Sequence, residues 1–309
     1  MTARPALAMD DNDEVLVDDE FLRIAYRVGA PDRLVVAFAG LGKAFGAVPM
    51  AEFAHSAWRD GGNSVVFVSD RKGIWFTAPG MTDQIVATVR ALHARIGAPP
   101  LITVGNSMGG YGAILFAQPL GARAAIAFGP QFSIRPGAVA GETRWQGAAR
   151  RSFGTLPDLG EALTHDIPCL ITHGLSEDDR FQAAAFPEAE HIAHVVYPRL
   201  NHNTARAIRK AGALSAIFEA GFAGDLDRMS RIAEDVGGTP RAAAEAEIKR
   251  RTPIPDSTFI QAGWWLFVVC ALFFIAVALI NRDWLSLLGS LAFLAANVAF
   301  MIPIYRRRK

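Results

Sequence analysis

The sequence predicts an α/β fold with a mostly parallel sheet covered by helices, followed by a hairpin of two transmembrane helices. Six apolar runs alternate with helical patterns over the first two thirds of the chain, which is the order expected of parallel strands joined by helices. Two later stretches of 22 residues each carry no charged residue. The chain is therefore expected to combine a globular domain with a membrane element.

The composition is apolar for a soluble protein and almost neutral in charge. Of the 309 residues 51% are hydrophobic, and the formal net charge is +1, so the charge balance does not indicate nucleic-acid binding. Cys169 falls in a predicted strand and Cys270 in an apolar helix, which favours unpaired thiols and a reducing compartment. The beginning of the chain lacks the pattern of a secretion signal, so we expect a cytoplasmic globular domain. Residues 1–13 are expected to be a disordered acidic N-terminus.

The strands are short apolar runs, rich in β-branched or aromatic residues, that end in glycine, aspartate or proline. They are 34–38, 65–68, 101–104, 124–128, 169–172 and 195–197, preceded by extended pieces at 15–17 and 21–28 that are expected to form an antiparallel lead-in. Helices are predicted at 49–60, 82–96, 111–118 and 204–220. The α/β domain is predicted to span residues 14–220.

The remainder of the chain is predicted to be a charged helical linker, 221–258, and a transmembrane hairpin, 259–305. The two spans, 259–280 and 284–305, each exceed the roughly 20 residues needed to cross about 30 Å of hydrocarbon. Basic residues flank both spans and form the tail 306–309. The positive-inside rule then places both flanks in the cytoplasm and the anchor in an inner or plasma membrane.

The strongest local signal is a Gly-x-Ser-x-Gly turn between a predicted strand and a predicted helix. Such a nucleophile elbow raises Ser107 on a sharp, strained turn so that its hydroxyl is accessible. Gly105 and Gly109 lack a Cβ, which lets the strand and the helix approach closely. The backbone N–H of Met108 would then point at a developing oxyanion.

The turn, the strand order and the downstream residues resemble the α/β-hydrolase superfamily. More narrowly, the run 106–113 followed by Gly129-Pro130-Gln131 is similar to a poorly characterised group of bacterial serine hydrolases. The resemblance covers roughly residues 30–220. It implies an α/β-hydrolase sandwich and a mechanism with serine, acid and histidine, and it supplies no substrate.

The other two members of the triad should follow the serine in the order acid, then histidine. The acid is expected after the strand 169–172, where Asp178 is favoured and Asp179 and Glu177 are alternatives. The base is expected just before the last helix of the domain, where His202 fits by position. His173 is its main rival, but it would take the place of the acid.

The remaining site residues are predicted from their positions at the ends of strands. Leu41 is expected to give the second oxyanion donor, with Gly40 next, because both follow the first core strand. Gly40, Tyr111 and Trp75 are expected to line the substrate pocket, although Trp75 could simply pack. Arg144 could belong to a lid. Histidines and carboxylates lack metal-ligand spacing, and neither a metal nor a cofactor is expected.

The sequence therefore predicts a membrane-tethered serine hydrolase that cleaves an ester, thioester or amide. The expected partners are the bilayer and a small-molecule or lipid-like acyl substrate, with no nucleic acid; the oligomeric state is left open. An acyltransferase using the same triad is a close variant. A non-catalytic scaffold that docks a membrane complex is the alternative from another class, because folds of this kind also host binding roles.

Overall fold

The computed structural model describes residues 13–41, 53–154, 156–175, 179–244 and 256–306. The chain divides into two compact units, Met1–Arg251 and Thr252–Lys309. The expected disordered start lies outside the described residues except for Asp13. That residue is ordered, because its carboxylate accepts hydrogen bonds from Arg27 Nε and Nη2 at 2.7 and 2.9 Å.

Within the described residues the first unit contains one sheet in the order β1-β2-β4-β3-β5-β6-β7-β8-β9. The strands are β1 Glu14–Asp18, β2 Leu22–Arg27, β3 Leu34–Phe38, β4 Ser64–Asp70, β5 Leu101–Asn106, β6 Ala124–Phe128, β7 Cys169–Gly174, β8 Ile192–Tyr197 and β9 Thr239–Pro240. Strands β3 to β8 are parallel, whereas β1 and β2 form the expected antiparallel lead-in and β9 pairs antiparallel with β8. This order, with a strand–turn–helix elbow after β5, is an α/β-hydrolase-like fold.

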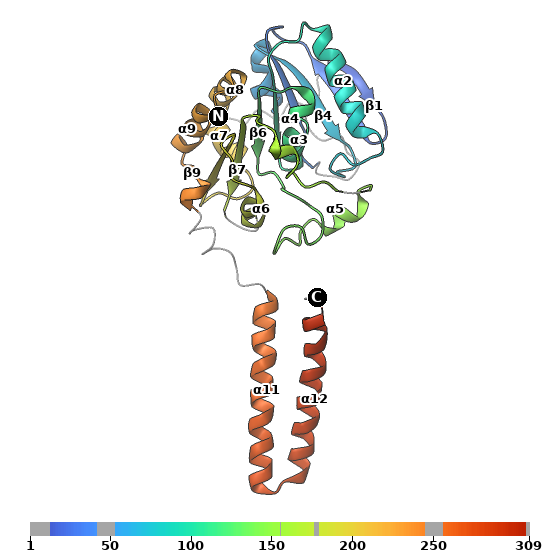
Figure 1. Cartoon of the computed structure of the whole chain (residues 1–309), viewed down its shortest axis with the longest axis vertical. Helices are drawn as coiled ribbons and strands as arrows, with labels where there is room; N and C mark the ends of the chain where they lie inside the picture. The colour runs from blue at the N-terminus through green and yellow to red at the C-terminus, as the bar shows by residue number, and fades with distance from the viewer. Residues whose placement is uncertain (1–12, 42–52, 155, 176–178, 245–255, 307–309) are drawn as a thin grey trace, which may run out of the picture. The chain divides into compact units, whose positions relative to one another are not determined.

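Helices cover both faces of the sheet (Figure 1). They are α1 Ala54–Trp58, α2 Met81–Arg95, α3 Met108–Leu115, α4 Ala117–Leu120, α5 Gln146–Arg151, α6 Asp179–Ala185, α7 Thr204–Lys210, α8 Leu214–Ala223 and α9 Leu226–Asp235, with 3₁₀ turns η1 Arg59–Gly61 and η2 Ala162–Thr164. Alternate residues of β3 belong to different cores. Val36 packs in the core under α2 and α3, and Val35 packs in the core under α1 and α8. Burial on both faces explains why the central strands appear in the sequence as continuous apolar runs.

The helix expected at 204–220 is two helices. Gly212, with φ of 76°, follows α7, and the N–H groups of Gly212 and Ala213 satisfy the carbonyls of Arg209 and Ile208. This is a left-handed glycine at a helix C-terminus. The chain then turns and α8 begins at Leu214.

The globular unit also continues beyond residue 220, where the sequence predicted a linker. Met229 and Ala233 of α9 are fully buried in the core under α8. Tyr197 of β8 donates its hydroxyl to the carbonyl of Ala233 at 2.8 Å, and β9 extends the sheet. Residues 221–240 are thus part of the α/β unit, and the rest of the expected linker lies largely outside the described residues.

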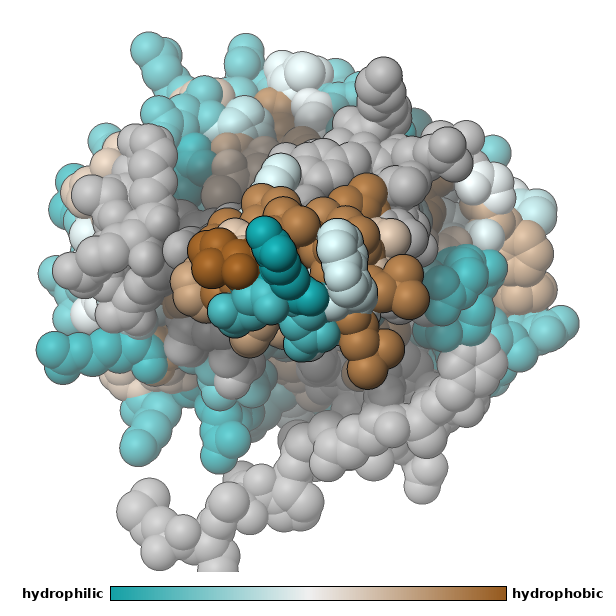
Figure 2. All heavy atoms as spheres, turned by 90° about the horizontal axis from the view of Figure 1, so that it is seen from below, coloured by the Kyte–Doolittle hydropathy of each residue, from teal (hydrophilic) through white to brown (hydrophobic). Residues whose placement is uncertain are grey.

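The second unit contains α11 Asp256–Asn281 and α12 Trp284–Arg306, which pack against each other. Ser286 donates from its backbone N and its hydroxyl to the Asp283 carboxylate at 3.1 and 2.5 Å, which fixes the turn. The segment Gly263–Asn281 is long and apolar enough to cross a membrane, with a mean hydropathy of 2.6. Its large side chains are exposed, and Figure 2 shows brown apolar surface around a teal polar tip.

Candidate active site

The nucleophile turn has the geometry that the glycine spacing predicts. Ser107 lies between β5 and α3 with φ of 58° and ψ of −124°. A Cβ on Gly105 would lie 2.0 Å from the carbonyl oxygen of Gly109, and a Cβ on Gly109 would lie 2.1 Å from that of Phe38. Only glycine fits at either position without moving backbone. The Ser107 N–H donates to the Phe128 carbonyl at 2.8 Å, which ties the elbow to the end of β6.

His202 and Asp179 form a second element of the site. His202 lies in the loop between β8 and α7, and its Nδ1 is 2.6 Å from Oδ2 of Asp179, the first residue of α6. A carboxylate accepts, so Nδ1 carries the proton and Nε2 is left as the basic nitrogen. Asp178, the acid favoured by the sequence, and its alternative Glu177 lie outside the described residues. The carboxylate that the structure brings to His202 is the other alternative, Asp179.

Ser107, Asp179 and His202 follow β5, β7 and β8, so all three lie at the carboxyl edge of the parallel strands. The His202 ring reaches the chain beside the elbow. A Cβ on Gly129 would be 3.1 Å from His202 Cε1. Gly129 follows Phe128, whose carbonyl holds Ser107. In the part of the chain that is described, Ser107 and His202 are not hydrogen-bonded to each other, a looseness that is common in ligand-free sites.

Arg144 holds the other oxygen of Asp179. It lies between β6 and β7, and its Nη1 donates to Asp179 Oδ1 at 2.8 Å. Glu142 in turn accepts from Nε and Nη2 of Arg144 at 3.0 and 2.6 Å. Burial raises the pKa of Asp179, but the hydrogen bonds from His202 and Arg144 outweigh it and hold that pKa below its usual value. Asp179 is therefore an ionised acceptor near neutral pH.

The predicted oxyanion donors lie on the two segments that meet at the elbow. Met108 is the first residue of α3, where a backbone N–H has no acceptor within the helix. The contact of Gly109 with Phe38 places the end of β3 against this helix start, and Gly40 and Leu41 come next in the chain. Leu41 is 41% exposed, and its side chain extends over Gly73.

The predicted pocket residues Tyr111 and Trp75 are each only 1% exposed. Tyr111 donates its hydroxyl to the carbonyl of Pro157 at 3.0 Å, and so joins α3 to the segment before η2. The ring of Trp75 packs edge-on against Trp145 at 5.4 Å. Both side chains are part of the packed hydrophobic core. The loop with Trp75 is organised by the buried Asp70 carboxylate, which accepts four backbone N–H groups.

No sequence pattern gives a role to Gln131, whose Nε2 donates to Ser107 Oγ at 3.3 Å. The run Gly129-Pro130-Gln131 enters only as part of the family resemblance. The two partners are separated by 24 residues, and no periodic pattern connects them. Their contact arises because β5 and β6 are adjacent in the sheet.

A buried histidine pair supports the same segment. His173 Nε2 is 2.8 Å from the Pro130 carbonyl, which can only accept, so this nitrogen carries a proton. Burial lowers the pKa of His173 to about 4 and lowers that of His194 well below its ordinary value, so both rings are neutral near pH 7. In neutral His173 the other nitrogen, Nδ1, is an acceptor, and it accepts from His194 Nε2 at 2.9 Å.

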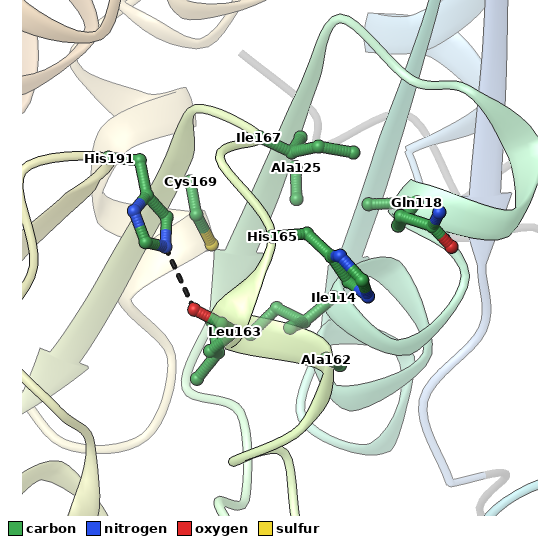
Figure 3. A pocket seen from close by; sticks show the side chains of 10 residues that line it. Ile114, Gln118, Ala125, Ala162, Leu163, His165, Ile167, Cys169 and His191 are labelled. Carbon is green, nitrogen blue, oxygen red and sulfur yellow. Dashed lines mark hydrogen bonds between the residues drawn. The ribbon is translucent and has the colours of Figure 1, made fainter.

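A small cavity lies elsewhere, between α3, η2 and the first residue of β7 (Figure 3). Its volume is about 10 Å³, the size of one water molecule. Cys169 and His191 face it, and His191 Nε2 contacts the Leu163 carbonyl at 2.9 Å. Cys169 begins β7 whereas Asp179 follows its end, so this cavity lies away from the candidate triad. Among the residues described, no group of three His, Cys, Asp or Glu side chains is arranged to hold a metal.

The neutral histidine pair predicts a pH-dependent stability. The unfolded histidines bind protons near pH 6.5 and the folded ones only at lower pH. The stability they contribute is therefore complete above about pH 6.5 and is lost as the pH falls toward about 4. His194→Gln keeps a donor for His173 and removes one titrating group. It should lower the slope of unfolding free energy against pH by about 1.4 kcal/mol per pH unit in this window.

Urea denaturation at several pH values would measure this slope. His165→Gln, which changes an exposed histidine, should keep the slope of the native protein. Identical slopes for the native protein and His194→Gln would contradict the neutral pair.

Comparison with known proteins gives fold-level similarity. No protein-family model matches the chain, and no curated protein sequence is similar to it. An α/β serine hydrolase without a lid from Xanthomonas campestris is 16% identical, with 69% of this chain and 95% of that chain covered and a TM-score of 0.42. The capsule O-acetyltransferase of Neisseria meningitidis serogroup A is 14% identical over 65% and 92%, with a TM-score of 0.49. An esterase from Pyrobaculum calidifontis is 13% identical over 75% and 86%, with a TM-score of 0.44. These similarities concern the fold alone and assign no activity or site residue to this chain.

Proposed function

We propose that this protein is a serine enzyme of acyl transfer, in the simplest case a hydrolase of an ester, thioester or amide, tethered to a membrane by its C-terminal helices. The observation that carries the proposal is the 2.6 Å contact of His202 with Asp179, at the same edge of the sheet as the strained Ser107. A nucleophile, a base and a group that orients the base are the three parts that this chemistry requires.

In the proposed mechanism Ser107 Oγ attacks the acyl carbonyl carbon while His202 Nε2 takes the hydroxyl proton. The Asp179 carboxylate stabilises the imidazolium that forms. The N–H of Met108, together with one from the loop after β3, stabilises the oxyanion. His202 returns the proton to the leaving group, and the acyl-enzyme is then attacked by an acceptor, which is water for a hydrolase and an alcohol for an acyltransferase.

Among the three adjacent acids, Asp179 is the best candidate for the triad acid. Its side chain is 4% exposed, and hydrogen bonds from His202 and Arg144 stabilise its ionised form. Both of its oxygens are engaged, so its orientation toward His202 is fixed. In this proposal Asp178 has no part in the triad.

The proposed tether consists of α11 and α12. Among the described residues, Gly263–Asn281 of α11 is the one segment long and apolar enough to span a bilayer, and α12 adds a shorter apolar stretch, Trp284–Val298. Their exposed apolar side chains would be solvated by lipid, and the turn at Arg282 and Asp283 is polar. Two spans put both flanks on one side of the bilayer. The basic flanks then favour a globular unit on the cytoplasmic side and an anchor in the inner or plasma membrane. A substrate that is lipid-like or handled at the bilayer surface fits this location.

The nucleophile can be tested with a fluorophosphonate probe. The full-length protein should be labelled, and Ser107→Ala should abolish labelling and lower esterase activity by on the order of 10⁴-fold or more, because no other group replaces the nucleophile. Ser152→Ala is the matched control and should be labelled normally. A folded native protein that does not react would favour the non-catalytic scaffold.

The acid can be identified by exchanging single carboxylates for amides. Asp179→Asn should lower kcat by about 10³- to 10⁴-fold, because an amide cannot hold the His202 tautomer that leaves Nε2 basic. Asp178→Asn should change kcat by less than about threefold. The converse pattern, with the large loss in Asp178→Asn, would assign the acid to Asp178.

The tether can be tested by alkaline carbonate extraction of membranes. The full-length chain should remain in the pellet, because two apolar spans insert almost irreversibly. A chain ending at Arg251 should move to the supernatant. Release of the full-length chain by carbonate would show that the helices do not span the bilayer.

A further inference from the structure

Gln131 is a buried polar residue at the nucleophile. Its side chain is 1% exposed, and its Nε2 donates to Ser107 Oγ at 3.3 Å. Its Oε1 is also buried, and among the described residues no donor contacts it. Buried acceptors in native proteins are almost always satisfied. The other end of this amide therefore indicates a donor that arrives with a ligand.

The backbone around Gln131 is held on both sides by buried side chains. His173 Nε2 donates to the Pro130 carbonyl at 2.8 Å. Gln182 Oε1 accepts from the Phe132 N–H at 2.8 Å, and its Nε2 donates to the Ser133 carbonyl at 3.1 Å. His173 belongs to β7 and Gln182 to α6, and Asp179 begins α6. The backbone that carries Gln131 is thus positioned by the same elements that position the acid, as the support of a catalytic group requires.

We propose, resting on the acyl-transfer function above, that Gln131 is a catalytic residue that selects water as the acceptor. In the resting enzyme its Nε2 holds Ser107 Oγ. In the acyl-enzyme Oγ is esterified, the amide turns from it toward the acyl carbon, and Oε1 accepts a hydrogen bond from the attacking water. The residue therefore directs the enzyme toward hydrolysis and away from transfer to simple alcohols.

Water and a monohydric alcohol differ in the number of O–H protons that they carry. Water attacks the acyl carbonyl carbon and gives one proton to His202 Nε2, while its second O–H donates to Gln131 Oε1. The bond from the acyl carbon to Ser107 Oγ then breaks, Oγ takes the proton from His202, and a carboxylic acid leaves. A monohydric alcohol gives its single O–H proton to His202. Its alkyl group then faces Oε1, which stays buried without a donor, and such a site discriminates against that acceptor.

The experiment measures how the acyl group of p-nitrophenyl acetate divides between water and methanol. The full-length enzyme is incubated in buffer with methanol, and acetic acid and methyl acetate are quantified. Gln131→Met keeps the length of the side chain and removes both polar atoms. It should raise the ratio of methyl acetate to acetic acid by about tenfold, the effect expected for loss of one buried hydrogen bond in the transition state.

Two further variants keep the result interpretable. Gln131→Glu retains an acceptor oxygen and should keep the low ratio of the native enzyme, even where its overall rate falls. Gln118→Met changes an exposed glutamine of α4 and should leave rate and ratio unchanged. Because the product ratio does not depend on the amount of folded enzyme, partial unfolding of a variant would not produce the expected change.

An unchanged ratio in Gln131→Met that still reacts with the fluorophosphonate would overturn the role of Gln131 and leave the acyl-transfer function intact. A native enzyme that already prefers methanol would do the same. A native enzyme that fails to react with the probe would instead refute the function on which this inference rests.

Discussion

The site depends on a place where three backbone segments meet with no side chain between them. Gly105 at the end of β5 touches the first turn of α3, and Gly109 in that turn touches the end of β3. At this contact the chain passes through Ser107 with a positive φ of 58°, a strained backbone conformation that costs on the order of 1–3 kcal/mol. Burial of α3 against the sheet offsets that cost, since nearly all of its side chains are inaccessible. The same contact brings the N-terminus of α3 and the loop after β3 together, and so gathers both expected oxyanion donors beside one hydroxyl.

The other half of the site is polar and is built from longer-range contacts. Asp179 is buried between His202 and Arg144, and an unpaired carboxylate there would be strongly unfavourable. Gln182, three residues further along α6, donates to Glu142 at 3.1 Å and also holds the segment that follows Gln131. Hydrogen bonds therefore join the segment between β6 and β7 to Asp179 through Arg144 and to α6 through Gln182. A substitution in this segment would change the surroundings of Asp179.

How much of this could be predicted from the sequence depends on how local each signal is. The strands could be predicted because burial on both faces produces uninterrupted apolar runs, and the elbow because its glycines flank Ser107 directly. The choice among Glu177, Asp178 and Asp179 could not, because three adjacent acids fit the same motif and only the start of α6 decides which one faces His202.

Other features depend on contacts that no local pattern encodes. Gln131 and Ser107 meet only because β5 and β6 are neighbours in the sheet. The end of the domain is hard to predict from the sequence because α9 is mostly polar and buries only two residues fully, Met229 and Ala233. A helix of that kind resembles a solvated linker when its partner strands are not known.

A cation, Arg144, lies beside the candidate acid Asp179 without opposing its proposed role. Arg144 alone would be a second positive charge near the imidazolium that the proposed mechanism forms on His202, and like charges repel in a partly buried site. Glu142, which is 5% exposed, accepts two side-chain hydrogen bonds from Arg144 and so pairs its charge. Glu142, Arg144 and Asp179 together carry one net negative charge, and this charge would face the imidazolium of the proposed mechanism. What Arg144 contributes is then direction: its Nη1 engages one carboxylate oxygen so that the other points at His202 Nδ1.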